Sequence, residues 1–254
     1  MTLVKRMHLR LSEFLMPGLF GLLVFGFAMP ASAGMFTVTP VRIFMNPKDR
    51  AVAVTITNEG DEEIVMQADL YLWKQAPGGQ DQLTATEDLL LSPPIIKLGP
   101  RARQVVRLAR LGAMANPTEQ LTYRMILREV PEARAAKGND MFLQIAMAMS
   151  MPVFITPPGA KGKLGCTAER IAANAVRATC ENSGNAHVHP TTLQLNNDAG
   201  EKLASDDAGG YILPEIKRSF DLKRKEGKIP AGKATLVVSL ADGTTESYAI
   251  TIGE

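Results

Sequence analysis

Histidines and methionines at alternating positions are the residues whose types and spacing could do chemistry in this chain. His187 and His189 are separated by one residue, so in an extended segment both point to one side, a spacing that can chelate a metal ion. Met147, Met149 and Met151 alternate in the same way, and thioether sulfur suits Cu(I). No carboxylate or cysteine is close to the histidines in sequence. Metal binding is therefore the alternative hypothesis, and our leading prediction is that the chain holds no metal.

Cys166 and Cys180 are the only cysteines of the chain. An even count of two favours one disulfide bond in a secreted protein. A structural zinc site would need four ligands with short paired spacings, which these cysteines do not supply. We predict a disulfide between them and an oxidising compartment.

The motifs that carry catalysis are missing from the sequence. It contains no Gly-x-Ser-x-Gly elbow, no phosphate-binding loop and no dinucleotide fingerprint. A convergent set of reactive groups, which an enzyme site requires, is not apparent either. We predict a protein that is not an enzyme and uses no cofactor.

The N-terminal segment has the order of a secretory signal peptide. Lys5, Arg6 and Arg10 precede the apolar run 19–29, which leads to the small residues 31–33. This arrangement predicts cleavage after residue 33, and the run is too short for a membrane-spanning helix. The full chain has 28 basic and 26 acidic residues, and 25 of each remain without the signal peptide. A neutral chain gives no indication of nucleic-acid binding.

The stretch 141–154 contains the methionines and alternates like a half-buried β-strand. Large apolar side chains share one face, and Gln144, Ala146, Ala148 and Ser150 share the other. We expect the large face to consist of Leu143, Ile145, Met147, Met149 and Met151.

Short alternating segments with turn residues between them precede this strand. They span residues 36–44, 51–57, 64–73, 89–98, 103–108 and 121–131, without an amphipathic helix between them. This pattern is typical of an immunoglobulin-like sandwich, whose final strand would be the stretch 141–154. Residues 132–140 are predicted to form a polar loop before it.

A second β-sandwich is predicted after a proline-rich linker at residues 156–159. Its expected strands span residues 175–182, 191–195, 234–240 and 246–252, and the predicted disulfide would connect its first two strands. We therefore divide the chain into a signal peptide (1–33), an N-terminal immunoglobulin-like domain (34–156) and a C-terminal β-sandwich domain (157–254). The predicted fold class is all-β.

These features together resemble the periplasmic pilus-assembly chaperones of the chaperone-usher pathway. The resemblance depends on two all-β domains, an arginine in the first strand, the segment 123–131 (Tyr-Arg-Met-Ile-Leu-Arg-Glu-Val-Pro) and the long alternating strand. It covers nearly all of the mature chain, and the segments around residues 123 and 152 are similar to the divergent, archaic branch. It implies two immunoglobulin-like domains in an L-shaped arrangement, periplasmic location, and pilus subunits and an outer-membrane usher as partners.

The resemblance also implies how a subunit would be held. In this family the last strand of the first domain is lent to a subunit whose own sandwich lacks a strand, the strand-addition mode of recognition. Leu143, Ile145, Met147, Met149 and Met151 would fill the subunit's groove. A strand of this kind without a guest is an aggregation hazard, which self-association of the free protein would relieve.

A charged anchor for the subunit's C-terminal carboxylate is a further implication. The family uses a first-strand arginine, matched here by Arg42, and a lysine on the lent strand, whose place is taken by Pro152. Arg124 and Arg128 are the two candidates for the second charge.

A third hypothesis for the function is a plain adhesion or structural β-sandwich, in which the strand packs inside its own core.

Overall fold

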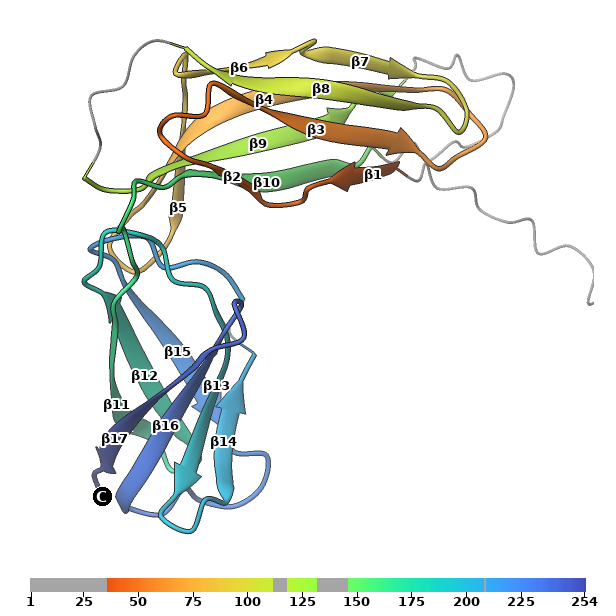
Figure 1. Ribbon diagram of the computed structural model, residues 1–254. Coiled ribbons are helices and arrows are strands. Elements are labelled where there is room, and N and C mark those ends of the chain that lie inside the picture. Colours follow the sequence, from red (N-terminus) through yellow and green to blue (C-terminus); the bar gives the residue numbers. More distant parts are fainter. Residues whose placement is uncertain (1–35, 112–117, 132–145, 208) are drawn as a thin grey trace, which may run out of the picture. The chain divides into compact units, whose positions relative to one another are not determined.

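The computed structural model describes residues 36–111, 118–131, 146–207 and 209–254 (Figure 1). Within these ranges the regular structure consists of β-strands, and no helix is long and apolar enough to cross a membrane. The all-β prediction with two sandwiches is confirmed. The predicted signal peptide, the loop 132–140 and the residues Leu143 and Ile145 lie outside the described residues.

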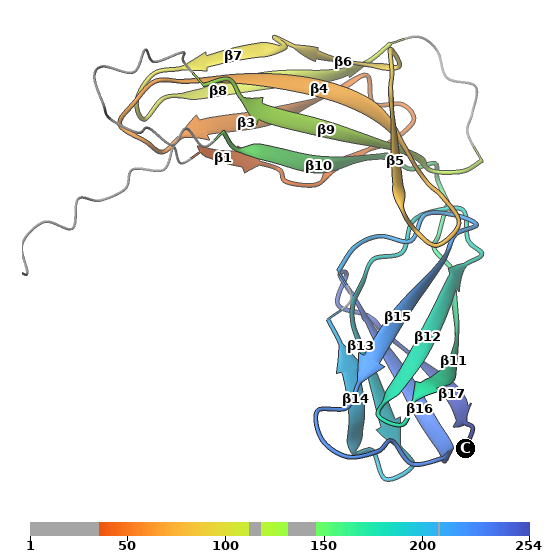
Figure 2. The same ribbon diagram turned by 180° about the vertical axis from the view of Figure 1, so that it is seen from behind.

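The first sandwich is built from two sheets that form two layers (Figures 1 and 2). One sheet has the strand order β1 (Phe36–Thr39), β3 (Ala51–Asn58), β8 (Arg103–Arg110), β6 (Leu89–Ser92). The other has the order β2 (Ile43–Met45), β10 (Ala148–Ile155), β9 (Leu121–Glu129), β4 (Ile64–Gln75), β5 (Asp81–Ala85), and β7 (Ile95–Leu98) also pairs with β4.

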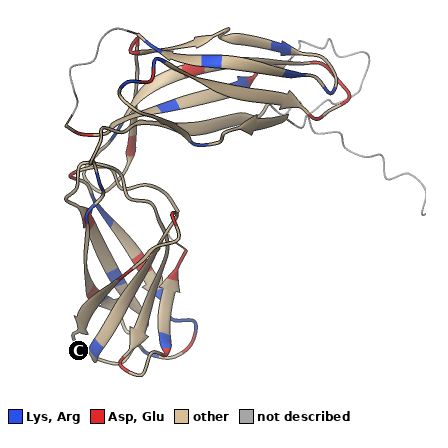
Figure 3. Ribbon diagram, viewed as in Figure 1, with Lys and Arg blue, Asp and Glu red and all other residues tan. Residues whose placement is uncertain are grey.

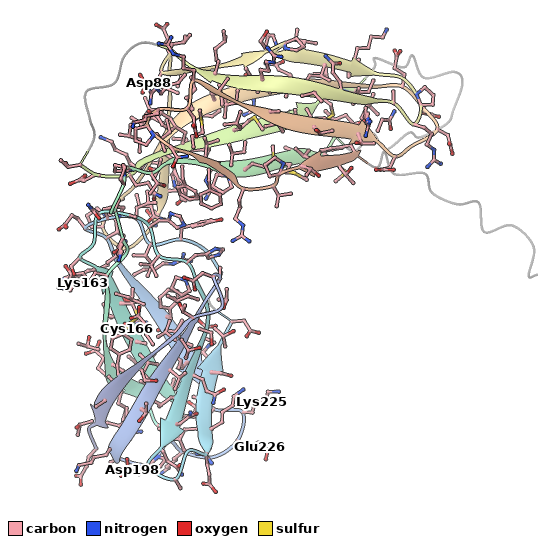
Figure 4. All side chains as sticks on the ribbon, viewed as in Figure 1. Asp88, Lys163, Cys166, Asp198, Lys225 and Glu226 are labelled. Atoms are coloured by element: carbon pink, nitrogen blue, oxygen red, sulfur yellow. A yellow bond between two sulfur atoms is a disulfide. The ribbon has the colours of Figure 1, made fainter. Side chains whose placement is uncertain are left out.

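Alternation along the strands produces the core of the first sandwich. Every second side chain of β3, β8, β9 and β10 points inward, because side chains of a strand alternate between the two faces of the sheet. The inward residues are large and apolar: Val54, Ile56, Val106, Leu108, Tyr123, Met125, Leu127, Met151, Val153 and Ile155. The buried Tyr123 hydroxyl donates a hydrogen bond to Asp88 Oδ2 at 3.0 Å, at the end of the sandwich marked in Figure 4.

The chain changes sheets between β1 and β2. β1 pairs with β3 in one sheet, whereas β2 runs parallel to the end of β10 in the other. The connecting residues 40–42 include a cis peptide bond between Thr39 and Pro40. This crossover places Arg42 beside β10, although the sequence pattern predicted one continuous strand over residues 36–44.

The second sandwich is formed by β11 to β17. Its strand order is β11 (Leu164–Ala172), β12 (Ala175–Asn182), β15 (Lys217–Lys223), β14 (Lys202–Asp206), β13 (Pro190–Asn197), β16 (Gly232–Leu240), β17 (Thr245–Ile252). The Tyr248 hydroxyl donates to Leu164 O at 3.0 Å and connects the two ends of this order. Basic and acidic residues are interspersed along the strands of both sandwiches (Figure 3), as the balanced composition implies.

The predicted disulfide between Cys166 and Cys180 is confirmed. The two cysteines are directly opposite each other in the pairing of β11 with β12, with their Cα atoms 4.1 Å apart. Both are buried in the core of the second sandwich, where Figure 4 marks Cys166. The bond therefore connects the first two strands of that sandwich, of which β11 was not among the predicted strands.

Buried amide side chains connect the two sandwiches. Gln75 donates from Nε2 to Tyr211 O at 3.0 Å and accepts at Oε1 from Leu213 N at 3.0 Å. Gln120 accepts at Oε1 from the backbone N–H of His187 at 3.0 Å. Trp73, Phe154, Tyr211 and Leu213 form a small apolar cluster around these bonds. Because buried polar groups are costly without partners, these bonds make the contact specific.

Candidate functional site

The inward face of β10 changes from buried to exposed along the strand. Met151 is 1% exposed and belongs to the core of the first sandwich, Met149 is partly buried, and Met147, just before β10, is 44% exposed. Met151, which was expected to face a guest, is packed in this structure against its own domain opposite Met125. The apolar face therefore continues beyond the core that covers it.

One edge of β10 is open over most of its length. All residues from Ala148 to Ile155 pair with β9, but only Val153 to Ile155 pair with β2. Among the described residues, positions 148–152 thus have a ladder partner on one side only. An unpaired edge of this kind is a template for another strand.

The direction of the free main-chain groups follows from two hydrogen bonds. Met147 O accepts from Glu129 N, on the β9 side, whereas Thr156 N donates to Met45 O, on the β2 side. Since main-chain groups alternate in direction along a strand, those of Ala148 and Ser150 point to the same side as those of Thr156. They face the open edge and are available to an added strand.

Arg42, Pro152 and Arg124 lie in one row across three neighbouring strands. Pro152 is directly opposite Arg124 in the pairing of β10 with β9. Val153 is opposite Ile43, so the preceding residues Pro152 and Arg42 are also neighbours. Residues that are opposite each other share a face, which puts both arginines on the outer face beside Pro152.

Arg124 is held in a partly buried pocket on this face. Its side chain is 13% exposed, its guanidinium carbon lies 3.8 Å from the centroid of the Trp73 ring, and its Nη2 atom lies 3.2 Å from Asp81 Oδ2. The same carbon is 5.6 Å from the centroid of the Tyr211 ring. Burial lowers the pKa of Arg124, and the Asp81 carboxylate opposes that shift.

Arg42 is exposed and reaches the same tyrosine. Burial raises the pKa of Tyr211, and the positive charges of Arg42 and Arg124 oppose that shift. A cavity of about 920 Å³ lies beside Arg42, between the β1–β2 connection and loops of the second sandwich. The structure thus brings Arg42 and Arg124 together at Tyr211.

Arg128, the other candidate for the second charge, lies elsewhere. It forms a short ion pair with Asp69 and donates from Nη2 to the Tyr71 hydroxyl at 3.4 Å. It is opposite Ala148, four residues before Pro152 on β10. Of the two candidates, Arg124 is the one that shares the row with Arg42.

His187 and His189 take part in ring stacking next to this row. The His187 ring stacks on Phe154 with 3.8 Å between centroids, and His189 stacks on Tyr211 at 4.1 Å. His187 Nδ1 donates to Gln120 Oε1 at 2.7 Å. Burial, His189 and Arg42 lower the pKa of His187 to about 4, which keeps its ring neutral. The described residues include no group of three or more histidines, cysteines or carboxylates able to hold a metal ion.

Three further residues of this site were not predicted from the sequence. Trp73 and Asp81 come from β4 and β5, and Tyr211 comes from a loop of the second sandwich. They meet the arginines through strand pairing and loop contacts over long sequence separations. Trp73 is the single tryptophan of the chain and lies at the end of an alternating strand, which is the only signal that pointed to it.

Two immunoglobulin-like sandwiches, an open strand edge and a pair of arginines beside that edge are the features of this chain that can be compared with known proteins. Residues 35–161, half of the chain, match the family model described as pili and flagellar-assembly chaperone, PapD N-terminal domain. The chain belongs to this family of chaperones.

Known proteins of similar sequence are fimbrial chaperones by name. The chain is 26% identical over 148 residues to the probable fimbrial chaperone YehC of Escherichia coli strain K12, and 21% identical over 131 residues to the probable fimbrial chaperone LpfB of Escherichia coli O157:H7. These alignments cover 57% and 51% of this chain and 59% and 53% of the relatives, so the chain matches somewhat more than half the length of each.

Solved structures share the fold over a larger part of the chain. The Acinetobacter baumannii CsuC–CsuE complex, a chaperone with a tip subunit from archaic chaperone-usher Csu pili, aligns with a TM-score of 0.61 and 19% identity over 87% of this chain and 100% of that chain. The E. coli chaperone DraB aligns with a TM-score of 0.56 and 18% identity over 87% of this chain and 97% of that chain. These likenesses support the two-sandwich fold.

Proposed function

We propose that this chain is a periplasmic chaperone that binds pilus subunits by lending them the strand that leads into β10, and that it delivers them to an outer-membrane usher. The observation that carries the proposal is the open edge at residues 148–152, next to an apolar face that emerges from its own core at Met147. Family membership and the similarity to fimbrial chaperones support it. The predicted signal peptide supports the periplasmic location.

Two kinds of interaction would hold the subunit. The free main-chain groups of Ala148 and Ser150 would extend the subunit's sheet, and the apolar side chains of Leu143, Ile145 and Met147 would fill its groove. Each large apolar side chain contributes ~1.5–3 kcal/mol when it is fully buried. Three of them give roughly 4.5–9 kcal/mol before the costs of ordering and association, which is enough to retain a subunit without a covalent bond.

Arg42 and Arg124 are proposed to anchor the C-terminal carboxylate of the subunit. The pair would replace the arginine and lysine of the family pattern, since Pro152 stands in the lysine's place and Arg124 is its direct cross-strand neighbour. A guanidinium can bind a carboxylate through two parallel hydrogen bonds, which fixes direction as well as position. The convergence of both arginines on Tyr211 supports this assignment.

Replacement of the proposed groove-filling residues tests the function. The double variant Ile145→Asp and Met147→Asp, co-expressed with a secreted subunit encoded beside the chaperone, should no longer co-purify that subunit. Ile95→Asp on β7 is the matched control, because Ile95 is an exposed apolar residue (62% exposed) away from β10. The control should retain the subunit. Retention of the subunit by the double variant, with a native unfolding profile, would refute strand donation.

A further inference from the structure

The Arg124 guanidinium already has a carboxylate bound to it. Asp81 Oδ2 lies 3.2 Å from Arg124 Nη2, and no other acidic side chain forms an ion pair with Arg124 among the described residues. Asp81 lies at the start of β5, an edge strand whose five residues are all exposed. The guanidinium that we assign to the guest carboxylate thus has an internal carboxylate as its present partner.

Asp81 is held in place from its other oxygen. Gln75 donates from Nε2 to Asp81 Oδ1 at 3.0 Å, and the same amide is bonded to Tyr211 O and Leu213 N. This chain of hydrogen bonds connects the loop of the second sandwich to the ion pair. The Asp81 carboxylate is therefore aimed at Arg124 and is not a freely rotating surface group.

The two partners differ in what they lose when they separate. The Arg124 side chain is 13% exposed, so its charge has lost most of its hydration and requires a counter-ion. The Asp81 side chain is 43% exposed and can turn to water at small cost, because a partly exposed ion pair is weak. An incoming carboxylate can therefore replace Asp81 without leaving Arg124 unpaired.

From this geometry we propose that Asp81 is a stand-in for the guest carboxylate, which keeps Arg124 neutralised and oriented in the free protein and exchanges with the guest on binding. This inference rests on the proposed function, because it takes Arg124 as one half of the carboxylate anchor. Asp81 is then the residue that sets the affinity of the anchor. Competition from an internal carboxylate weakens guest binding and favours later release of the guest.

The aspartate at position 69 provides a matched control. Asp69 forms an ion pair with Arg128 across β4 and β9, on the same outer face of the sheet. Asp69→Asn changes the net charge by the same amount as Asp81→Asn and leaves Arg124 untouched. Asparagine at position 81 keeps an oxygen that can accept from Gln75, so the local fold is retained.

The experiment measures the preference for a free carboxylate. The probe is the hexapeptide acetyl-Thr-Val-Thr-Val-Thr-Val, with either a free carboxylate or an amide at its C-terminus. Binding is followed by the fluorescence of Trp73, the single tryptophan, whose ring lies under the Arg124 guanidinium. The preference is the ratio of the Kd of the amide to the Kd of the acid. We expect Asp81→Asn to raise it about threefold, the effect of removing one weak competing ion pair, and Asp69→Asn to leave it unchanged.

The outcomes separate the two proposals. An Asp81→Asn protein whose preference equals or falls below that of the wild type overturns the stand-in role and leaves the arginine anchor in place. A wild-type protein that binds acid and amide equally overturns the anchor itself. An equal rise in the Asp69→Asn protein would trace the effect to net charge and also overturn the role of Asp81.

Discussion

Met147 and Met151 lie on the same face of one strand, and the structure predicts opposite consequences of shortening them. Met151 is 1% exposed in the core of the first sandwich, whereas Met147 is 44% exposed. Met→Ala substitutions in a packed core cost ~2–5 kcal/mol, because transfer free energy is lost and a cavity remains. Surface substitutions usually stay within ~0.5 kcal/mol. Met151→Ala should therefore lower the free energy of unfolding by several kcal/mol, and Met147→Ala should hardly change it.

Urea unfolding followed by the fluorescence of Trp73 measures this difference, because that tryptophan lies on β4 of the first sandwich and is buried against Phe154, Tyr211 and Leu213. Capture of a co-expressed subunit gives the complementary readout. Met147→Ala should weaken capture, because its side chain gains its apolar contacts only in the complex. Met151→Ala, at temperatures where it is folded, should capture normally. Equal losses of stability in the two variants, or a loss of capture confined to Met151→Ala, would refute the division of β10 into a core segment and a lent segment.

Three further predictions concern the rest of the fold. Replacement of Cys166 and Cys180 by alanine should lower stability by roughly 3 kcal/mol, the value expected for a loop closed over a sequence separation of 14, and differential scanning calorimetry with and without reductant checks it. Asn58→Ala should lower the free energy of unfolding by roughly 2–3 kcal/mol in chemical unfolding. The buried Asn58 side chain donates from Nδ2 to Glu62 O and Gly99 O and accepts at Oδ1 from Gly60 N, and these three groups would lose their partner. The free energy of unfolding should fall as pH decreases from about 6.5 toward 4, because His187 has a pKa of about 4 in the folded protein and takes up its proton at higher pH in the unfolded chain. His187→Gln should flatten this pH dependence. An unchanged slope in that variant would argue against the burial of the His187 ring.

The alternation of apolar residues predicted most strands of the first sandwich but not their limits. The segment 36–44 divides at Pro40 into strands of two different sheets, and the segment 89–98 divides at the prolines 93 and 94 into β6 and β7. β5 was missed because Asp81–Ala85 is polar and wholly exposed, so no period of two is visible. In the second sandwich β11, β14 and β15 were missed for a similar reason, since their outward faces carry many charged or small residues.

The candidate site was predictable where a single strand carries the signal and unpredictable where partners meet across the fold. The shared face of Met147, Met149 and Met151 could be predicted from spacing, but the point at which the core ends could not, because it depends on how far the opposite sheet extends. Arg124 could be preferred over Arg128 only after the register placed it opposite Pro152. Asp81 and Tyr211 carry no local signal, because their roles arise from contacts with residues more than 40 positions away.

Pro152 stands at the position where the family pattern has a lysine, and the structure shows how a proline is accommodated there. Its main-chain nitrogen faces the β2 side, in the same direction as that of Thr156, so the missing N–H removes no hydrogen bond to β9. Proline is tolerated at such an edge position and cannot donate to an added strand. A guest strand that pairs with Ala148 and Ser150 therefore receives no hydrogen bond from position 152, and β2 covers the edge from Val153 onward. In the proposed complex, the ladder of the guest would end at the row that contains Arg42 and Arg124. Under the proposed function, Pro152 would thus limit how far the guest extends, and the cross-strand Arg124 would supply the charge that a lysine at position 152 supplies in the family pattern.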